Sequence, residues 1–504
     1  MKRIVFLIIA SLLVLGLVLP GCGGDAEPDF DQYITFAVTG PMDDRQGEHH
    51  WAGAEMARDA INDAGGVDVG GTIYGIKLVE VDTNEVAGTP AEGVNALTAV
   101  ISGVDFVVGG FRTEAVVAYR EVAMDEKVIF LNCGAATGTL QYSVVSNYDR
   151  YKYWFKATPY NETFLVKSLL KMTATIGGAF KAALVAMGSD VIDEYEVGAP
   201  DKLRVAIVME NLTWADGMVA AANYYLPLLG FNVTGTWRPS ATATSITTEL
   251  GEIEATYPHI IFTAFSGPVG LTYSKQRAEL EIPALTLGIN VENQSKGAWY
   301  ATNQGCQYDI FLDTWAENMS VTATSVDWFN AFVTKVGDYP LYNAATYDAI
   351  YTLKVAIEAE DSLNAAVLIP YLETHTYMGV GAKTGYYPMG AIDLGGGVFA
   401  LNETQVTDLY DLASYNWTYA QDDWRCGYTA GPTQQPHIFH DTVYGPGWQT
   451  GIGSQWQDGA KVGIWPMVLA APGTPGPWID QYGDWNFAYN GTATIHLPTE
   501  WFAE

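Results

Sequence analysis

The stretch from Phe106 to Thr137 constrains the fold of this chain most strongly. It contains an apolar run (106–108), a Gly109-Gly110 turn, a segment with the apolar spacing of a helix, and a second apolar run (128–131). Two buried strands joined by a helix form a crossover unit, which requires a parallel sheet. Small and polar residues follow each strand, so a ligand could approach backbone N–H groups at this edge. The alternative is that these residues only turn the chain.

The same alternation of strands and helices occurs in two blocks, which predicts an α/β protein with parallel sheets covered by helices. The first block has expected strands at 33–38 and 76–81 and helices at 51–64 and 90–102. The second has expected strands at 203–209, 231–237, 260–264 and 283–287, with helices at 164–175, 214–229, 246–256 and 269–280. Three more helices are expected at 326–336, 345–360 and 365–374, followed by Gly-, Tyr- and Trp-rich short strands.

Length and charge narrow the class of protein. A chain of 504 residues is too long for one compact core and predicts two or three domains. Its 25 Lys and Arg against 57 Asp and Glu give a net charge of −32. Such a charge repels nucleic acid and anionic membrane surfaces, so we expect no nucleic-acid partner.

The N-terminal residues have the pattern of an export signal. Lys2 and Arg3 precede an apolar run (4–19) that is shorter than a membrane-spanning helix, and Leu19-Pro20-Gly21-Cys22 follows. This ending resembles the lipobox of a secreted lipoprotein, which predicts a signal peptide over 1–21, lipidation of Cys22 and a polar tether over 22–30. An uncleaved anchor or an ordinary signal peptide are the alternatives, and both also place the protein outside the cytoplasm.

Three further cysteines and eight glycosylation acceptor patterns fit an exported protein. Cys306 and Cys426 lie in polar, loop-like contexts and are the expected disulfide pair, whereas Cys133 is expected to be a buried filler. The Asn-x-Ser/Thr patterns, which a Thr-rich composition could also produce, begin at Asn161, Asn211, Asn232, Asn293, Asn318, Asn402, Asn416 and Asn490.

Several segments, taken in order, resemble the type I solute-binding proteins of branched-chain amino-acid ABC transporters. They are Thr39-Gly40-Pro41, Gly53-Ala54, INDAGGV (61–67), YGIKLVEVDT (74–83), VVGGFRT (107–113), DEKVIFLNCGAAT (125–137), NAATYDAIYTLKVAIEA (343–359), HDTVYG (440–445) and QWQDGAKVGIWP (455–466). The resemblance implies two lobes joined by three crossings that close on a ligand by a hinge motion. It implies lobe 1 over 31–157 and about 320–375, lobe 2 over 158–319 and about 376–466, and a C-terminal extension over 467–504.

The implied function is capture of a small polar ligand by a monomer that a lipid holds at the outer face of the membrane, and its delivery to the permease of an ABC importer. A ligand sensor with a separate membrane partner and a secreted glycan-acting hydrolase are the alternatives. The sequence contains no GxSxG elbow, phosphate loop or HExxH motif, so we expect no enzymatic activity, no cofactor and no metal. The metal candidates, Glu48-His49-His50 and His437, His440 and Asp441, fit polar turns better.

The resemblance also implies a set of ligand-binding residues. Carried over position by position, they are Arg45, Gln46, Phe111, Arg112, Thr113, Ala135, Ala136, Thr137, Trp214 and Ser266. The Thr113 hydroxyl, the N–H groups of 135–137 and Arg112 could hold a carboxylate, and Trp214 could cover an apolar part of the ligand.

One position departs from the family. The branched-chain binders hold the ligand ammonium with a glutamate just after the strand expected at 283–287, where this chain has Asn290 and, two residues on, Glu292. An amide cannot neutralise an ammonium as a carboxylate does, whereas Glu292 could if the loop shifts. Amino acids, amides, short carboxylates and other small polar metabolites therefore all stay open as ligands.

Overall fold

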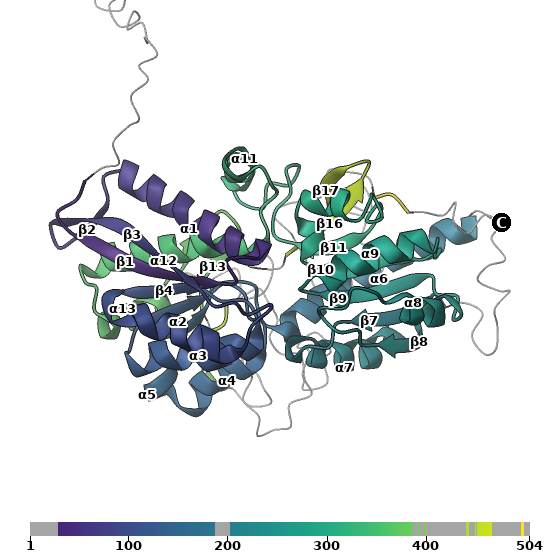
Figure 1. Cartoon of the computed structure of the whole chain (residues 1–504), viewed down its shortest axis with the longest axis horizontal. Helices are drawn as coiled ribbons and strands as arrows, with labels where there is room; N and C mark the ends of the chain where they lie inside the picture. Colours follow the sequence, from purple (N-terminus) through teal and green to yellow (C-terminus); the bar gives the residue numbers. More distant parts are fainter. Residues whose placement is uncertain are drawn as a thin grey trace, which may run out of the picture.

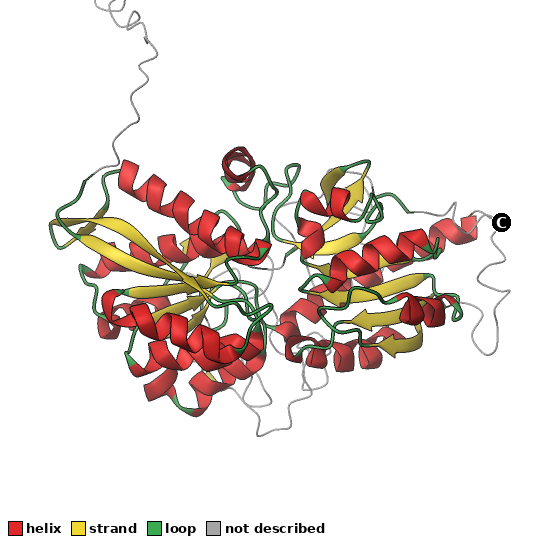
Figure 2. Ribbon diagram, in the orientation of Figure 1, coloured by secondary structure: helices red, strands yellow, loops and turns green. Residues whose placement is uncertain are grey.

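Two α/β lobes lie side by side in the computed structural model (Figure 1). The structure describes residues 29–186, 202–386, 392–393, 399–400, 440–442, 449, 451–465 and 495–497. The expected signal peptide, Cys22, Cys426, His437 and most of the expected β-rich C-terminal decoration lie outside these residues. The predicted fold class, two lobes each built on a sheet flanked by helices, is confirmed (Figure 2).

The first lobe contains a six-stranded sheet in the order β2-β3-β1-β4-β5-β6. All neighbours pair in parallel except β2 and β3, which form an antiparallel hairpin at the edge. The strand bounds are β1 Tyr33–Gly40, β2 Val67–Val69, β3 Thr72–Asp82, β4 Phe106–Gly109, β5 Ile129–Asn132 and β6 Trp154–Lys156.

Helices cover this sheet on both faces (Figure 2). Helix α2 shows how local sequence sets a boundary: Thr89 and Glu92 form a capping box and Pro90 occupies the first turn, where no N–H partner is needed. Helices α1 and α12 pack together, as do α2 and α3. The bounds are α1 Arg45–Asp63, α2 Pro90–Val100, α3 Thr113–Asp125, α4 Gly138–Ser146, α5 Tyr148–Tyr151, α12 Thr346–Glu360 and α13 Ala365–Thr374, with a 3-10 turn, η1, at Ile101–Gly103.

The second lobe contains a seven-stranded sheet in the order β17-β16-β11-β10-β9-β7-β8. The five strands from β11 to β8 pair in parallel, and the hairpin of β16 and β17 adds an antiparallel edge beside β11. The bounds are β7 Arg204–Met209, β8 Asn232–Trp237, β9 Ile260–Phe265, β10 Leu285–Asn290, β11 Ile310–Asp313, β16 Ile452–Gln457 and β17 Ala460–Trp465.

Alternate residues of these strands build two separate cores. Val205, Ile207 and Met209 of β7 pack with α6 and α7, whereas Ala206 and Val208 pack with α8 and α9. This alternation is what a strand buried on both faces requires, because successive side chains point to opposite sides. The helix bounds are α6 Glu162–Ala186, α7 Thr213–Leu228, α8 Thr247–Glu254, α9 Val269–Glu279 and α10 Gly297–Ala301, with a 3-10 turn, η3, at Glu292–Gln294.

The long helix α6 is apolar enough to span a membrane by length and composition. Its residues Leu169, Leu170, Ile176 and Phe180 are, however, fully or almost fully buried in the core of the second lobe. A core helix passes the same hydropathy test, so α6 is explained by packing within the lobe.

Among the described residues, the chain changes lobe at three places. It crosses at 157–161 between β6 and α6 and at 314–324 between β11 and α11 (Ser325–Val336). The third change lies between Thr442, which pairs with Tyr386 of the first lobe, and β16 of the second. A 3-10 turn, η4 (Tyr342–Ala345), leads into α12. The expected first-lobe boundary near 375 needs correction, because Tyr386 is buried in the first lobe's core and the hairpin of β12 (Tyr377–Met378) and β13 (Lys383–Thr384) precedes it.

Two expectations about covalent chemistry also need correction. Cys306 is a buried free thiol packed against Phe311 and Trp456, so it is not in the expected disulfide with Cys426. Burial raises the pKa of Cys306 to about 12 and that of Cys133 to about 12, which fits packing roles. The side chains of Asn161 and Asn293 are buried and hydrogen-bonded, so neither can be glycosylated in the folded protein.

Candidate ligand-binding cleft

The two sheets bring their topological switch points, where strand order reverses, to the junction of the lobes. In the first lobe this point lies between β1 and β4, and in the second between β7 and β9. A cleft of about 1120 Å³, open solvent included, is lined by residues that follow β4, β7 and β9, among them Arg112, Trp214 and Ser266. Small ligands of α/β proteins commonly bind at such switch points.

The wall contributed by 111–113 is held in place by Glu85, a buried residue that follows β3. Its carboxylate accepts the N–H of Phe111 at 3.2 Å and of Arg112 at 2.5 Å, and the hydroxyls of Thr83 at 2.6 Å and Tyr119 at 3.2 Å. Burial raises the pKa of Glu85 to about 7, against these hydrogen bonds, which lower it. The N–H groups of 111 and 112 are therefore used within the protein and are not available to a ligand.

Arg112 and Thr113 present unpaired donors at this wall. Arg112 Nη1 donates to the carbonyl oxygen of Val86 at 3.0 Å, which fixes the guanidinium. Its Nε and Nη2, and the hydroxyl of Thr113, are buried without a hydrogen-bond partner, and both residues line the cleft. Since unpaired buried donors are costly, these three atoms indicate where an acceptor-rich group would bind.

The opposite wall is built on Glu210, a fully buried residue after β7. Its carboxylate accepts Trp214 Nε1 at 2.7 Å and the hydroxyl of Ser266. Burial raises the pKa of Glu210, while Ser266, Trp214 and the charge of Arg112 lower it. These bonds fix the indole and hydroxyl that face the cleft. A Cβ on Gly267 would lie 3.0 Å from Arg112 Nη2, so the guanidinium of the first lobe comes close to the Gly267 backbone of the second.

Most of the remaining lining is apolar. Four aromatic side chains, Phe111, Tyr160, Trp214 and Tyr342, contribute to it. Aliphatic side chains come from 165, 289, 291, 312, 321 and 452. Such a lining favours a ligand with an apolar body and one polar end.

Two aspartates also line the cleft, and both are already bonded. Asp313 forms a buried ion pair of 2.7 Å with Lys461. Asp348 accepts the N–H groups of Val380 at 2.8 Å and Gly381 at 2.9 Å, and burial raises its pKa to about 6.

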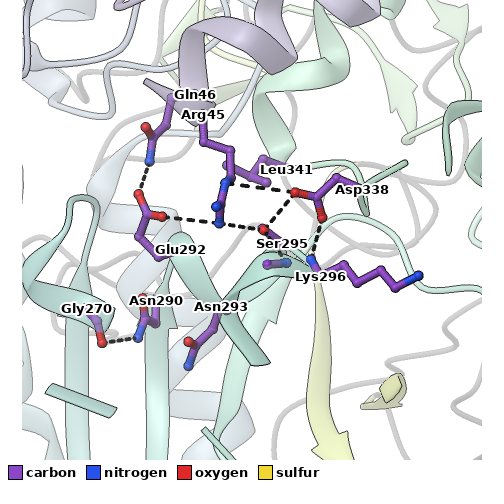
Figure 3. Close-up of polar contacts among 12 residues, drawn as sticks. Arg45, Gln46, Gly270, Asn290, Glu292, Asn293, Ser295, Lys296, Asp338 and Leu341 are labelled. Carbon is purple, nitrogen blue, oxygen red and sulfur yellow. Dashed lines mark hydrogen bonds and ion pairs between the residues drawn. The ribbon is translucent and has the colours of Figure 1, made fainter. Parts of the chain in front are cut away.

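Asn290 does not face the cleft, which corrects the predicted ligand contact. Strand β10 extends to Asn290 instead of ending near 287, and the residues on either side of Asn290, Ile289 in the strand and Val291 directly after it, line the cleft. Asn290 therefore points to α9, where its Nδ2 donates to the carbonyl oxygen of Gly270 at 3.0 Å (Figure 3). The sequence match expected position 290 to lie after the strand, whereas β10 continues to Asn290 and fixes the direction of its side chain.

Arg45, Gln46 and Glu292, all predicted to touch the ligand, instead connect the lobes (Figure 3). Gln46 Nε2 donates to Glu292 Oε1 at 2.7 Å and to the carbonyl oxygen of Ser266 at 3.2 Å. Arg45 Nη1 donates to Ser295 Oγ at 2.6 Å and lies 3.7 Å from Glu292 Oε2, while its Nε lies 3.9 Å from Asp338. We call Arg45, Gln46, Glu292, Ser295 and Asp338 the interlobe contact.

Of the three residues predicted to bind the ligand after β5, one lines the cleft and two do not. Ala136 lines the cleft. Ala135 is buried in the first lobe's core, and Thr137 caps α4 by accepting the N–H of Thr139 at 3.4 Å. Sequence reasoning missed Glu85, Glu210 and Asp348, because an acid in a loop or early in a helix gives no local sign that it will be buried.

The histidines and the aspartate considered as metal ligands form hydrogen bonds within the protein wherever the structure describes them. Within the described part of the chain, no group of three His, Cys, Asp or Glu side chains could hold a metal ion. His49 accepts the N–H of Leu341 at 3.0 Å, and His50 lies 3.0 Å from Asn343 Nδ2. His440 contacts Glu373 at 2.8 Å, and Asp441 accepts Asn161 Nδ2 at 2.5 Å.

A protein-family model described as "Periplasmic binding protein" matches residues 34–391. The chain belongs to the periplasmic binding protein family. The match spans both lobes of this binding protein and the first two crossings between them. A search of curated proteins found no match.

Solved binding proteins share the fold at low sequence identity. A leucine-binding protein from Thermotoga maritima is 14% identical, with 85% of this chain and 97% of that chain covered and a TM-score of 0.57. A branched-chain amino-acid transporter substrate-binding protein from Streptococcus pneumoniae, in complex with isoleucine, is 17% identical (70% and 92% covered, TM-score 0.56). An ABC-transporter solute-binding protein from R. palustris, in complex with benzoate, is 12% identical (86% and 95% covered, TM-score 0.59).

Proposed function

We propose that this protein is a lipid-anchored extracytoplasmic solute-binding protein that captures a small carboxylate-bearing ligand between its lobes and delivers it to an ABC importer. The observation that carries the proposal is the set of unpaired donors, Arg112 Nε, Arg112 Nη2 and Thr113 Oγ1, at one wall of the interlobe cleft. A carboxylate accepts several hydrogen bonds at once and pairs with a guanidinium in a fork geometry.

The similar structures support this choice of ligand group. Isoleucine and benzoate, named in two of them, differ in their bodies but both carry a carboxylate. Family membership and the N-terminal signal together support capture outside the cytoplasm and delivery to a permease. The proposal of a lipid anchor is based on the sequence Leu19-Pro20-Gly21-Cys22.

Ligand binding is tested by titrating the purified chain with amino acids, short organic acids, aromatic acids and amides. We expect one ligand per chain, and stabilisation of about 2.7 kcal/mol at a ligand concentration 100 times the Kd. Arg112→Gln should lose this binding, whereas Arg58→Gln, a change of the same charge on α1, should keep it. If no compound raises the melting temperature of the wild type, the proposal fails.

The anchor is tested separately in cells. Cys22→Ser should release the protein into the medium or periplasm, because the lipid would have no attachment point. Retention of the variant in washed membranes would contradict lipidation at Cys22 and leave the ligand assay unaffected.

A further inference from the structure

We propose that the cleft selects a monocarboxylate with an apolar body and rejects the corresponding α-amino acid. The inference rests on the proposed function and concerns what surrounds the ligand carboxylate. An α-ammonium is attached to the carbon next to the carboxylate, so both groups must be accommodated in the same part of the cleft. An ammonium removed from water needs a carboxylate or several acceptors close by.

Among the described residues, no free acid lines the cationic end of the cleft. Two acids close to Arg112 are used within the protein. Glu85 accepts the Arg112 N–H at 2.5 Å, and Glu210 is near the guanidinium, because a Cβ on Gly267 would lie 3.0 Å from Arg112 Nη2 and 3.9 Å from Glu210 Oε2. The Glu210 carboxylate is fully buried and already accepts Trp214 Nε1 and the Ser266 hydroxyl. It contributes to the wall through those two side chains.

In the related branched-chain binders, an acid for the ligand ammonium is expected at the end of the strand that corresponds to β10. In this protein, the side chains that line the cleft there are aliphatic. At the end of β10, Ile289 and Val291 line the cleft, and Asn290 between them bonds to the carbonyl oxygen of Gly270. Glu292, the next acid along the chain, accepts Gln46 Nε2 at 2.7 Å and lies 3.7 Å from Arg45. Both positions considered for an ammonium contact are therefore used inside the protein.

The two lining aspartates are also committed. Lys461 pairs with Asp313 at 2.7 Å, with both side chains fully buried, so that charge is neutralised. Each Asp348 oxygen accepts one backbone N–H, from Val380 or Gly381. Among the described residues, every carboxylate at the cleft thus has a partner, whereas Arg112 Nε, Arg112 Nη2 and Thr113 Oγ1 have none. The imbalance favours an anion over a zwitterion.

Matched ligands separate the carboxylate from the ammonium. We would titrate the full chain calorimetrically with 4-methylpentanoate, leucine and 4-methylpentanamide, and repeat the series with 3-phenylpropanoate, phenylalanine and 3-phenylpropanamide. We expect the carboxylates to bind at least about tenfold more tightly than the amino acid or amide of the same skeleton, as for one lost charge-assisted hydrogen bond.

Variants identify the residues responsible. Arg112→Gln and Thr113→Val should each remove most of the preference for carboxylate over amide, with melting temperature checking that both fold; Arg58→Gln should keep it. Asp348→Asn tests the strongest rival, an ammonium contact at Asp348, and should leave the ranking unchanged.

Three results have distinct meanings. Tighter binding of the carboxylates supports the inference. Equal or tighter binding of leucine or phenylalanine, lost in Asp348→Asn or not, overturns it and leaves the proposed solute-binding function standing. If none of the six compounds binds, and the wider panel is also without effect, the inference and the proposed function both fail.

Discussion

Gln46 in the first lobe donates a hydrogen bond of 2.7 Å to the buried carboxylate of Glu292 in the second lobe. With Arg45, Ser295 and Asp338, this pair forms an interlobe contact outside the residues that line the cleft. Contacts made only when two lobes are together favour the closed form, whatever the ligand touches. Changes in the interlobe contact should therefore alter the free energy of closure without altering which ligand the cleft prefers.

Glu292→Ala should weaken ligand binding by about fivefold without changing ligand preference. The substitution removes the Gln46 hydrogen bond and the ion pair with Arg45, so a smaller fraction of the protein occupies the closed form. Calorimetric titration gives the Kd, and small-angle scattering of the unliganded variant should show a larger radius of gyration. Glu279→Ala, an acid at the exposed end of α9, is the matched control. An unchanged Kd would contradict a role in closure.

Asn290→Asp should destabilise the protein by about 1–3 kcal/mol and leave ligand affinity unchanged. The new carboxylate would face the carbonyl oxygen of Gly270, which now accepts a hydrogen bond from Nδ2, and would bury a charge without a donor. Urea unfolding measures the loss of stability, and titration with matched acids and amino acids measures the preference. Acquisition of amino-acid binding by this variant would show that position 290 faces the ligand after all.

Glu85→Ala should weaken ligand binding by about tenfold, although Glu85 does not line the cleft. Its carboxylate accepts the N–H groups of Phe111 and Arg112, so its loss frees the segment that positions the guanidinium. Glu85→Gln keeps one acceptor oxygen and should restore part of the affinity. A stability loss with an intact Kd in both variants would reduce Glu85 to a structural role.

Acidification should destabilise the protein through His50. Burial lowers the pKa of His50 to about 4, so the folded form keeps this imidazole neutral while the unfolded chain protonates it near pH 6.5. The unfolded state therefore binds the extra proton, and stability is lost as the pH falls below 6.5, by about 2 kcal/mol from this residue at pH 5.

The contribution is isolated by comparing wild type and His50→Gln in urea at pH 7.5 and pH 5. All other titrating groups are common to both proteins and cancel in the difference. The variant should be less stable at pH 7.5 but should lose about 2 kcal/mol less on acidification. Parallel pH dependences in the two proteins would show that His50 does not stay neutral in the folded state.

The first wall of the cleft was predictable from sequence because its signals are local. The apolar runs of β4 and β5, the Gly109-Gly110 turn and the polar ends of the strands lie within 32 consecutive residues, from Phe106 to Thr137. This local pattern indicated a ligand site at Thr113, and the family resemblance implied Phe111 and Arg112 beside it; all three line the cleft.

The rest of the site depends on relationships that are not local. Gln46 and Glu292 are 246 positions apart, and nothing near either residue indicates that they meet. The error at Asn290 came from the length of β10: a strand ending near 287 would leave position 290 in a loop, whereas a strand continuing to 290 fixes its face by alternation. Glu85 lies 27 positions from Arg112, in a loop that only tertiary packing buries.

The most direct test of the account is a structure of the protein with 3-phenylpropanoate bound. The account predicts one ligand in the interlobe cleft, with its carboxylate within about 3 Å of Arg112 Nε or Nη2 and of Thr113 Oγ1, and its ring among the apolar lining. A carboxylate directed away from Arg112, or a ligand bound outside the cleft, would contradict it.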